Sequence, residues 1–243
     1  LGALVFIIGA ISASLGNAFL LIMWGELWSN LANGRVGQHL YASYTFAFVL
    51  YFMIIWIPWP LSLCITAALP VASSAILFAC RAEPKRTSSV VPLDVKTIPT
   101  LRLLVCIFFI STVWGYSQGI VGAFNTSGEN FMNQSLLLAG LAIGAITLSM
   151  ILNPSLPEPL ALYRPVIPAM FAGILLSIML PHSLSFVGNG LIVMGVYCLD
   201  MLMMLVTTDI AFRSRIPVAL TFGVTILIAR LGTFCGTVGA VFL

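Results

Sequence analysis

Two charged side chains lie inside otherwise apolar stretches of this chain. Asp200 stands in "VYCLDMLMM" and Arg230 in "ILIARLGTF". An unpaired charge in the middle of a bilayer costs at least about 2.5 kcal/mol, so each charge should face protein or a water-filled cavity. Three interpretations stay open: the two residues line a ligand-binding cavity, they form a structural ion pair or water-bridged contact, or the predicted helix ends are misplaced and one residue is interfacial.

Three further polar residues are candidates for ligand binding or coupling. Asn17 and Asn189 carry amide groups that could line a cavity or cross-link helices. Glu26, in "MWGELWSN", is predicted to lie at the membrane interface, where a structural role is favoured. The candidate residues for binding or coupling are therefore Asp200, Arg230, Asn189, Asn17 and Glu26.

Metal and enzyme chemistry have little support in the sequence. The five cysteines are widely separated, form no C-x-x-C pair and lie within or at the ends of apolar runs, which is typical of packing residues: Cys64, Cys80, Cys106, Cys198 and Cys235. His39 and His182 stand at predicted membrane interfaces. The sequence contains no H-E-x-x-H, no G-x-S-x-G, no phosphate-binding glycine loop and no paired intramembrane carboxylates. We predict no catalytic residue, no metal and no cofactor.

Composition determines what kind of elements must position these residues. The 243 residues are 60% hydrophobic and 7% charged, with a mean hydropathy of +1.12. A soluble domain carries roughly 25% charged residues and must present polar faces to water. The chain is therefore predicted to be an integral membrane protein whose main partner is the lipid bilayer.

Eight apolar runs are long enough to cross the roughly 30 Å hydrocarbon core of a bilayer as helices. They are approximately Leu1–Met23, Leu40–Ile57, Leu61–Cys80, Leu101–Ala123, Met132–Leu152, Val166–Leu180, Phe186–Val206 and Pro217–Leu243. A β-barrel would show alternating segments of about ten residues instead. The predicted fold is an all-α, polytopic helical bundle. Counted from the predicted cytoplasmic helix ends, Asp200 lies about 9 Å deep and Arg230 about 20 Å deep, so direct contact is not expected.

The cations predict the orientation of the spans. Nine of the ten Lys and Arg residues fall in or beside alternate connections, which the positive-inside bias places in the cytoplasm. Two of these connections are Trp24–His39 and Thr207–Ile216. The residues assigned to topology or lipid contact are Arg81, Lys85, Arg86, Lys96, Arg102, Arg213 and Arg215. Trp24 and Trp28 are predicted at the inner interface and Trp56 and Trp59 at the outer one, with a core position as the alternative. The chain is therefore predicted to be a multi-pass membrane protein with its basic connections in the cytoplasm.

The long basic connection divides the chain. Residues 1–80 are predicted to hold three membrane helices, 81–100 a basic cytoplasmic loop, and 101–243 five more helices. Two bundles of six, as in the major facilitator architecture, would place three further helices before Leu1 and one after Leu243. Leu1 in place of Met and the apolar end "GTFCGTVGAVFL" are read as signs of a fragment. Three G-x-x-x-G pairs, Gly115–Gly119, Gly140–Gly144 and Gly232–Gly236, predict close helix packing and make no prediction of oligomeric state.

Two stretches carry a family resemblance. "LGNAFLLIMWGELWSNL" (Leu15–Leu31) and "FRSRIPVALTFGVTILIARLG" (Phe212–Gly232) resemble the membrane half of actinobacterial regulators of the LuxR class. The matching positions are Gly16, Trp24, Gly25, Glu26, Arg215, Pro217, Phe222, Gly223 and Arg230. The chain departs from that pattern at Ser214, where a glycine would commonly precede the basic residue.

The resemblance implies a major-facilitator-like sensory bundle of about a dozen helices in the inner (cytoplasmic) membrane of a bacterium. DNA would then be a partner only through a helix-turn-helix domain outside this chain. We therefore expect a sensor of a small ligand or of the membrane state, and the alternative is a secondary transporter of a small molecule. Against transport, Asn153–Pro165 lacks a basic-glycine-basic gating motif, and Asp200 is the only deeply placed carboxylate. A purely structural membrane protein is the third hypothesis.

Overall fold

The computed structural model describes residues 2–30, 33–80, 100–124, 129–152, 166–181, 184–214 and 217–242. Within these ranges eight helices follow one another. The connection from α2 to α3, which is fully described, is a short turn. They are α1 (Gly2–Asn30), α2 (Asn33–Ile55), α3 (Leu61–Cys80), α4 (Thr100–Phe124), α5 (Glu129–Leu152), α6 (Val166–Met179), α7 (Ser185–Ser214) and α8 (Val218–Val241). The prediction of an all-α protein is confirmed.

Five stretches of helix are long and apolar enough to cross a membrane, judged by length and composition. In the described part of the chain they are Val36–Ile55, Leu61–Cys80, Phe131–Leu152, Ser185–Phe212 and Val218–Val241. Shorter apolar stretches, Leu101–Tyr116 and Val166–Ser177, lie in α4 and α6. The structure thus supports a membrane protein with several spanning helices, whereas eight spans and a twelve-helix architecture stay predictions.

Three helices run well past the ends predicted for them. α1 continues from Met23 to Asn30, α2 begins at Asn33 rather than Leu40, and α7 continues from Val206 to Ser214. Much of the two predicted connections Trp24–His39 and Thr207–Ile216 is therefore helical. Apolar run length measures the part of a helix suited to hydrocarbon, and a helix can continue beyond it wherever no proline or capping signal stops it.

The extension of α7 has a visible local cause. The Thr207 hydroxyl donates to the carbonyl oxygen of Met203 at 2.7 Å, and the Thr208 hydroxyl donates to that of Met204 at 2.6 Å. Both threonines are buried. Because each hydroxyl is satisfied by the preceding turn of its own helix, these polar residues do not end the helix.

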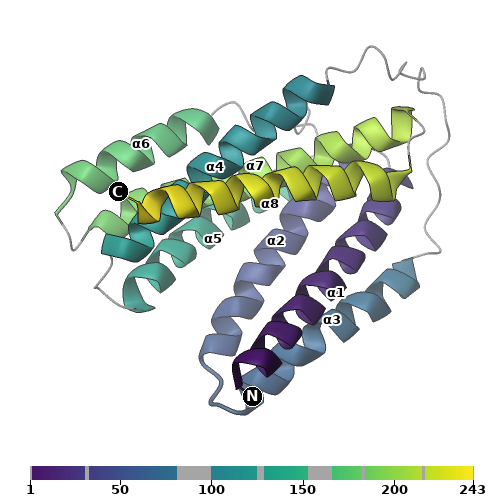
Figure 1. Cartoon of the computed structure of the whole chain (residues 1–243), viewed down its shortest axis with the longest axis horizontal. Coiled ribbons are helices and arrows are strands. Elements are labelled where there is room, and N and C mark those ends of the chain that lie inside the picture. The colour runs from purple at the N-terminus through teal and green to yellow at the C-terminus, as the bar shows by residue number, and fades with distance from the viewer. Residues whose placement is uncertain are drawn as a thin grey trace.

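The helices gather into two groups (Figure 1). α1, α2 and α3 lie together, and we call them the N-terminal group; α4 to α8 form the C-terminal group. Within the C-terminal group the most extensive contact joins α4 to α8, and α7 packs against both α5 and α6. The two groups are connected by α2 packing on α5 and α7 and by α1 packing on α7 and α8.

Glycines bring α4 and α8 to within backbone contact. A Cβ atom on Gly115 would lie 2.0 Å from the carbonyl oxygen of Thr233, and one on Gly236 would lie 2.0 Å from that of Thr112. No side chain fits at such distances, so only glycine allows this approach. The predicted packing role of the pairs Gly115–Gly119 and Gly232–Gly236 is confirmed, and the two pairs face each other within one chain.

The third pair, Gly140–Gly144, packs α5 against α2. A Cβ atom on Gly140 would meet the ring of Phe48 at 3.0 Å, and one on Gly144 would lie 3.6 Å from the Thr45 methyl group. This contact is looser than the seam between α4 and α8, since it involves side chains and not backbone. It places the aromatic helix α2 along the C-terminal group.

The four tryptophans predicted at the membrane interfaces divide into two kinds. Trp56 is 86% exposed and Trp59 79% exposed, at the end of α2 and in the turn that follows it. Trp28 is buried in the hydrophobic core, and the indole of Trp24 donates to the Ser73 hydroxyl of α3 at 3.0 Å. The predicted interfacial role is therefore wrong for Trp28, since the extension of α1 carries this ring into the contact between helices, and Trp24 joins α1 to α3.

α1 meets α8 near the C-terminal end of α1. A Cβ atom on Gly25 would lie 3.1 Å from the ring of Phe222, which is only 1% exposed. Toward the other end of α1, residues 11–17 are all exposed. Close contact between α1 and α8 is thus established at the end predicted to be cytoplasmic.

Candidate functional site

Asp200 and Arg230 lie at similar distances from the adjoining ends of two neighbouring helices. Asp200 precedes Ser214, the end of α7, by 14 residues, and Arg230 follows Val218, the start of α8, by 12 residues. At 1.5 Å per residue these separations are about 21 Å and about 18 Å. The helix end from which the depth of Asp200 was counted was wrong, because α7 runs eight residues further than its apolar run. The depth of either residue in a membrane stays a prediction, but counting from the observed helix ends no longer argues against an interaction.

Both residues line one cavity of about 440 Å³. Its walls come from α4, α7 and α8, with Leu21 of α1 as the contribution of the N-terminal group. This volume lies within the range of about 300–1,000 Å³ that is usual for small-molecule sites. The cavity is thus large enough for a small ligand and is built mainly by the C-terminal group.

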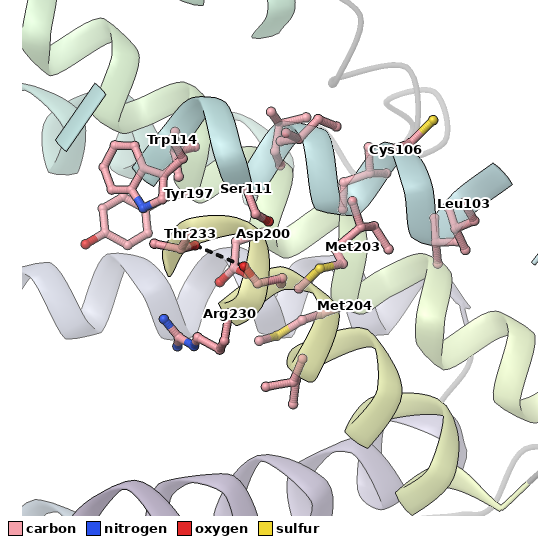
Figure 2. Close-up of a pocket in the computed structure, with 18 of the residues that line it drawn as sticks. Leu103, Cys106, Ser111, Trp114, Tyr197, Asp200, Met203, Met204, Arg230 and Thr233 are labelled. Carbon is pink, nitrogen blue, oxygen red and sulfur yellow. Dashed lines mark hydrogen bonds between the residues drawn. The ribbon is translucent and has the colours of Figure 1, made fainter. Parts of the chain in front are cut away.

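The cavity is lined by a few polar groups within a mainly apolar wall (Figure 2). Asp200, Arg230 and Thr233 lie near the Trp114 and Tyr197 rings. The rest of the lining is formed by apolar and sulfur-containing side chains, among them Leu103, Cys106, Met203 and Met204, and the two methionines lie beside the charged residues. A few convergent polar groups on an otherwise apolar wall are typical of ligand pockets.

The Asp200 carboxylate is held from the other helix group. The hydroxyl of Tyr44, in the middle of α2, donates a hydrogen bond of 2.5 Å to Oδ2 of Asp200. In the described part of the chain this hydroxyl is the only hydrogen-bond partner of the Asp200 carboxylate.

Aromatic rings surround this hydrogen bond. The ring of Tyr197, one turn before Asp200 on α7, packs edge-on against Tyr44 with centroids 5.8 Å apart and against Phe48 with centroids 5.2 Å apart. Edge-to-face aromatic pairs at these distances are favourable. The rings limit access to the Tyr44 hydroxyl and fix α2 against α7 where the carboxylate lies.

Arg230 acts on Asp200 through the electric field and not through a direct ion pair. Its charge attracts that of Asp200, yet within the described part of the chain there is no salt bridge between the two and no hydrogen bond from the Arg230 guanidinium. Arg230 is exposed, whereas Asp200 is half-buried. Two opposite charges therefore face one cavity while each keeps donors or acceptors available.

The other three predicted site residues lie away from this cavity. Asn17 is exposed on α1, and Glu26 is exposed near the C-terminal end of the same helix. Asn189 is 2% exposed near the start of α7, three helical turns from Asp200, and neither polar atom of its amide finds a partner among the described residues. The structure thus brings together Asp200 and Arg230 and leaves Asn189, Asn17 and Glu26 apart from them.

The cationic residues assigned to topology are only partly described. Arg81, Lys85, Arg86, Lys96 and Arg215 lie outside the described residues, as does His182. Arg213 belongs to α7, although its side chain lies outside the description, and Arg102 is exposed in the first turn of α4. Their predicted cytoplasmic location stays a prediction.

Sequence reasoning missed Tyr44 and Tyr197. The signal for Tyr44 was present as a stripe of Tyr41, Tyr44, Phe48 and Tyr51, whose spacing of three and four residues places them on one face of a helix. This stripe packs on the C-terminal group, as shown by the hydrogen bond of 3.2 Å from the Tyr51 hydroxyl to Asn133 of α5. The partner of Tyr44, however, lies 156 residues away in the chain.

The described residues contain no group of three or more His, Cys, Asp or Glu side chains that could hold a metal ion. Cys198 is buried, Cys80 is half-buried, and Cys64, Cys106 and Cys235 are exposed. Cys106 also lines the cavity, where its thiol adds to the apolar side. The chemistry available at the site is therefore electrostatic and hydrogen-bonding recognition.

The two stretches that carry the family resemblance contact each other in space, through Gly25 of α1 and Phe222 of α8. Gly223, which also belongs to the pattern, has no atom within 4 Å of an ideal Cβ, so packing gives no reason for a glycine there. Comparison of the chain with models of protein families, with curated proteins and with solved structures found no match.

Proposed function

We propose that this chain is a membrane-embedded sensory domain that binds a small molecule in the cavity of Asp200 and Arg230. The observation that carries the proposal is the hydrogen bond from Tyr44 to Asp200, because it joins the binding cavity to the contact between the two helix groups. A ligand that engages the Asp200 carboxylate changes the partner that α2 has on α7. Occupancy of the cavity is thereby coupled to the arrangement of the groups.

The coupling requires that the ligand bind one arrangement more tightly than the other. The bond from Tyr44 supplies this difference in affinity. A ligand group that competes for the Asp200 carboxylate binds more tightly to the arrangement in which the Tyr44 hydroxyl no longer donates to Asp200. In the proposal the chain crosses the membrane eight times as part of a twelve-helix, major-facilitator-like bundle with its basic connections in the cytoplasm. The LuxR-class output, through a DNA-binding domain outside this chain, rests on the sequence resemblance alone.

The test measures whether the bond between Tyr44 and Asp200 controls the position of the helix groups. Spin labels are placed on a cysteine-free variant at Leu63 of α3 and Phe234 of α8, which are both exposed. We expect Tyr44→Phe to shift or broaden the distance distribution between these labels. A second label pair, Leu141 and Phe234, lies within the C-terminal group and should report no change.

Tyr116→Phe is the matched control, because the Tyr116 hydroxyl has no hydrogen-bond partner in the described residues. An unchanged distribution between Leu63 and Phe234 in the Tyr44→Phe variant would contradict the proposed coupling. A shift of equal size in the Tyr116→Phe variant would show that the effect is not specific to the bond with Asp200.

A secondary transporter is the second candidate. It is favoured by the contact of α1 with α8 at the predicted cytoplasmic end, together with the exposure of residues 11–17 toward the other end, since alternating access needs helix groups that separate on one side at a time. Uptake into proteoliposomes separates the two functions: a sensor binds its ligand without accumulating it, while a transporter accumulates it in a manner that depends on Asp200.

A further inference from the structure

The cavity contains one negative side chain, Asp200, and one positive side chain, Arg230, which form no salt bridge with each other in the described structure. Asp200 accepts one hydrogen bond, at Oδ2 from Tyr44, and in the described structure Arg230 makes neither a hydrogen bond nor a salt bridge. A guanidinium offers five donors and a carboxylate about four acceptor positions. Most of the hydrogen-bonding capacity of both groups is therefore available to a molecule in the cavity.

The charge balance restricts which molecule fits best. A ligand that is only a cation would neutralise Asp200 and bring a second positive charge to Arg230, and a ligand that is only an anion would do the reverse at Asp200. Charges at membrane depth are costly unless they are compensated. A ligand with one positive and one negative group compensates both side chains and leaves the net charge of the site unchanged.

The remaining wall of the cavity indicates the rest of the ligand. The apolar part of the lining includes Leu103, Cys106, Met203 and Met204, which offer no charged group, and the two methionines lie beside Asp200 and Arg230 (Figure 2). Methionine side chains are flexible and adapt to apolar groups of different shape. An apolar substituent attached to the charged part of the ligand would be buried there.

From these features we infer that the cavity binds a small zwitterion with an apolar substituent, such as an amino acid, with the ammonium group on Asp200 and the carboxylate on Arg230. The inference rests on the proposed function and specifies its ligand class. The ammonium group replaces the Tyr44 hydroxyl as the partner of Asp200, while the Arg230 guanidinium binds the ligand carboxylate through paired N–H groups. The apolar substituent lies against Met203 and Met204.

Calorimetric titration of the whole chain in lipid nanodiscs tests the inference with four related probes. L-leucine carries both charges and an apolar side chain, L-leucinamide keeps only the ammonium, N-acetyl-L-leucine keeps only the carboxylate, and glycine keeps both charges without the side chain. We expect L-leucine to bind the wild-type protein about 10- to 100-fold more tightly than either singly charged probe, since each loses one charge-assisted interaction. Glycine should bind more weakly than L-leucine.

Charge-removing variants sharpen the test. In Asp200→Asn the preference should pass to N-acetyl-L-leucine, and in Arg230→Gln to L-leucinamide, because each variant leaves one charge to be compensated. Arg230→Lys keeps the cation and should keep the preference for L-leucine, which guards against variants that merely fold poorly. Each protein is first checked for a single symmetric elution peak.

If a singly charged probe bound the wild-type protein as tightly as L-leucine or more tightly, the inference of a zwitterionic ligand would be wrong, although the cavity would still be a ligand site. Absence of binding by all four probes would also overturn it. If the spin-label distances in Tyr44→Phe were unchanged as well, the proposed function itself would fall. The two failures are therefore distinguishable.

Discussion

Among the described residues, the Asp200 carboxylate has a single hydrogen-bond donor, the Tyr44 hydroxyl, which comes from the other helix group. Tyr44 is therefore the residue whose substitution should affect the site most directly. The carboxylate is half-buried, receives the Tyr44 hydroxyl at Oδ2 and has Arg230 as a nearby but separate countercharge. Buried carboxylates need donors or countercharges, because an apolar surrounding provides neither. Loss of the hydroxyl should therefore lower the free energy of unfolding and loosen the packing of α2 against α7.

Tyr44→Phe is expected to lower the free energy of unfolding by about 0.5–2 kcal/mol, the range measured for hydrogen bonds between membrane helices. The ring contact with Tyr197 is kept, so the loss reports the hydroxyl. Denaturation in mixed micelles measures the change. The effect should largely disappear in an Asp200→Leu background, where there is no carboxylate to receive the bond; full additivity of the two substitutions would argue against a direct interaction.

At the scale of single elements, the pairing of α4 with α8 depends on glycine. The two G-x-x-x-G pairs interlock so closely that neighbouring carbonyl oxygens occupy the positions where Cβ atoms would lie. In membranes, where lipid is as apolar as the helix surfaces, such close packing is a principal source of helix association. This seam also forms one wall of the cavity, since Arg230 and Thr233 come from α8 and Trp114 from α4.

Gly236→Ala is expected to lower the free energy of unfolding by about 1–3 kcal/mol or to reduce the yield of folded protein, because the added methyl group collides with the carbonyl of Thr112 at 2.0 Å. Gly239→Ala provides a control on the same helix, since its Cβ would meet nothing within 4 Å. The control should be neutral or slightly stabilising, because alanine favours helix more than glycine does. Equal losses in both variants would rule out the backbone contact as the cause.

The second element that matters is α2, which belongs to the N-terminal group by sequence and packs along the C-terminal group. Thr45 and Thr147 share a hydrogen bond of 2.7 Å between α2 and α5, and the Thr147 hydroxyl lies 3.2 Å from the carbonyl oxygen of Tyr41. Together with the bond from Tyr44 to Asp200, these contacts form a row of polar links on one face of α2. In the proposed function, α2 is an element through which a change at the cavity would reach the N-terminal group.

At the scale of the whole molecule, the positive charge of the connections predicts an orientation that can be measured. The stretch 81–102 holds five of the ten Lys and Arg residues, while 124–131 holds none. By the positive-inside bias, the basic connections are expected on the cytoplasmic side. The orientation decides which face of the bundle the cavity and the residues 11–17 of α1 communicate with.

Single cysteines introduced at Ser88 and Ser127 of a cysteine-free variant test this orientation. A membrane-impermeant thiol reagent should label Ser127→Cys in intact cells and Ser88→Cys only after the cells are permeabilised. The reverse result would invert the topology. Labelling of both positions in intact cells would mean that an odd number of crossings does not separate them, in conflict with the predicted spans.

The sequence by itself determined the class of the protein and the location of most helices along the chain. Composition and the length of apolar runs are local quantities, and they were sufficient to predict an all-helical membrane protein and the bounds of α3 as observed. They also singled out Asp200 and Arg230, because a charge inside an apolar run is conspicuous without any knowledge of its surroundings.

Only the tertiary structure decided what those charges face. α7 continues past its apolar run, with the Thr207 and Thr208 hydroxyls bonded to carbonyl oxygens of their own helix, and the packing of α7 on α8 brings Asp200 and Arg230 to one cavity. The donor to Asp200 lies 156 residues away in the chain. The residues that contact the glycine pairs could not be predicted from the sequence either, because side-chain direction and helix pairing follow from packing in three dimensions. The same packing buried Asn189 away from the cavity, although the sequence had made it a candidate for lining a cavity or cross-linking helices.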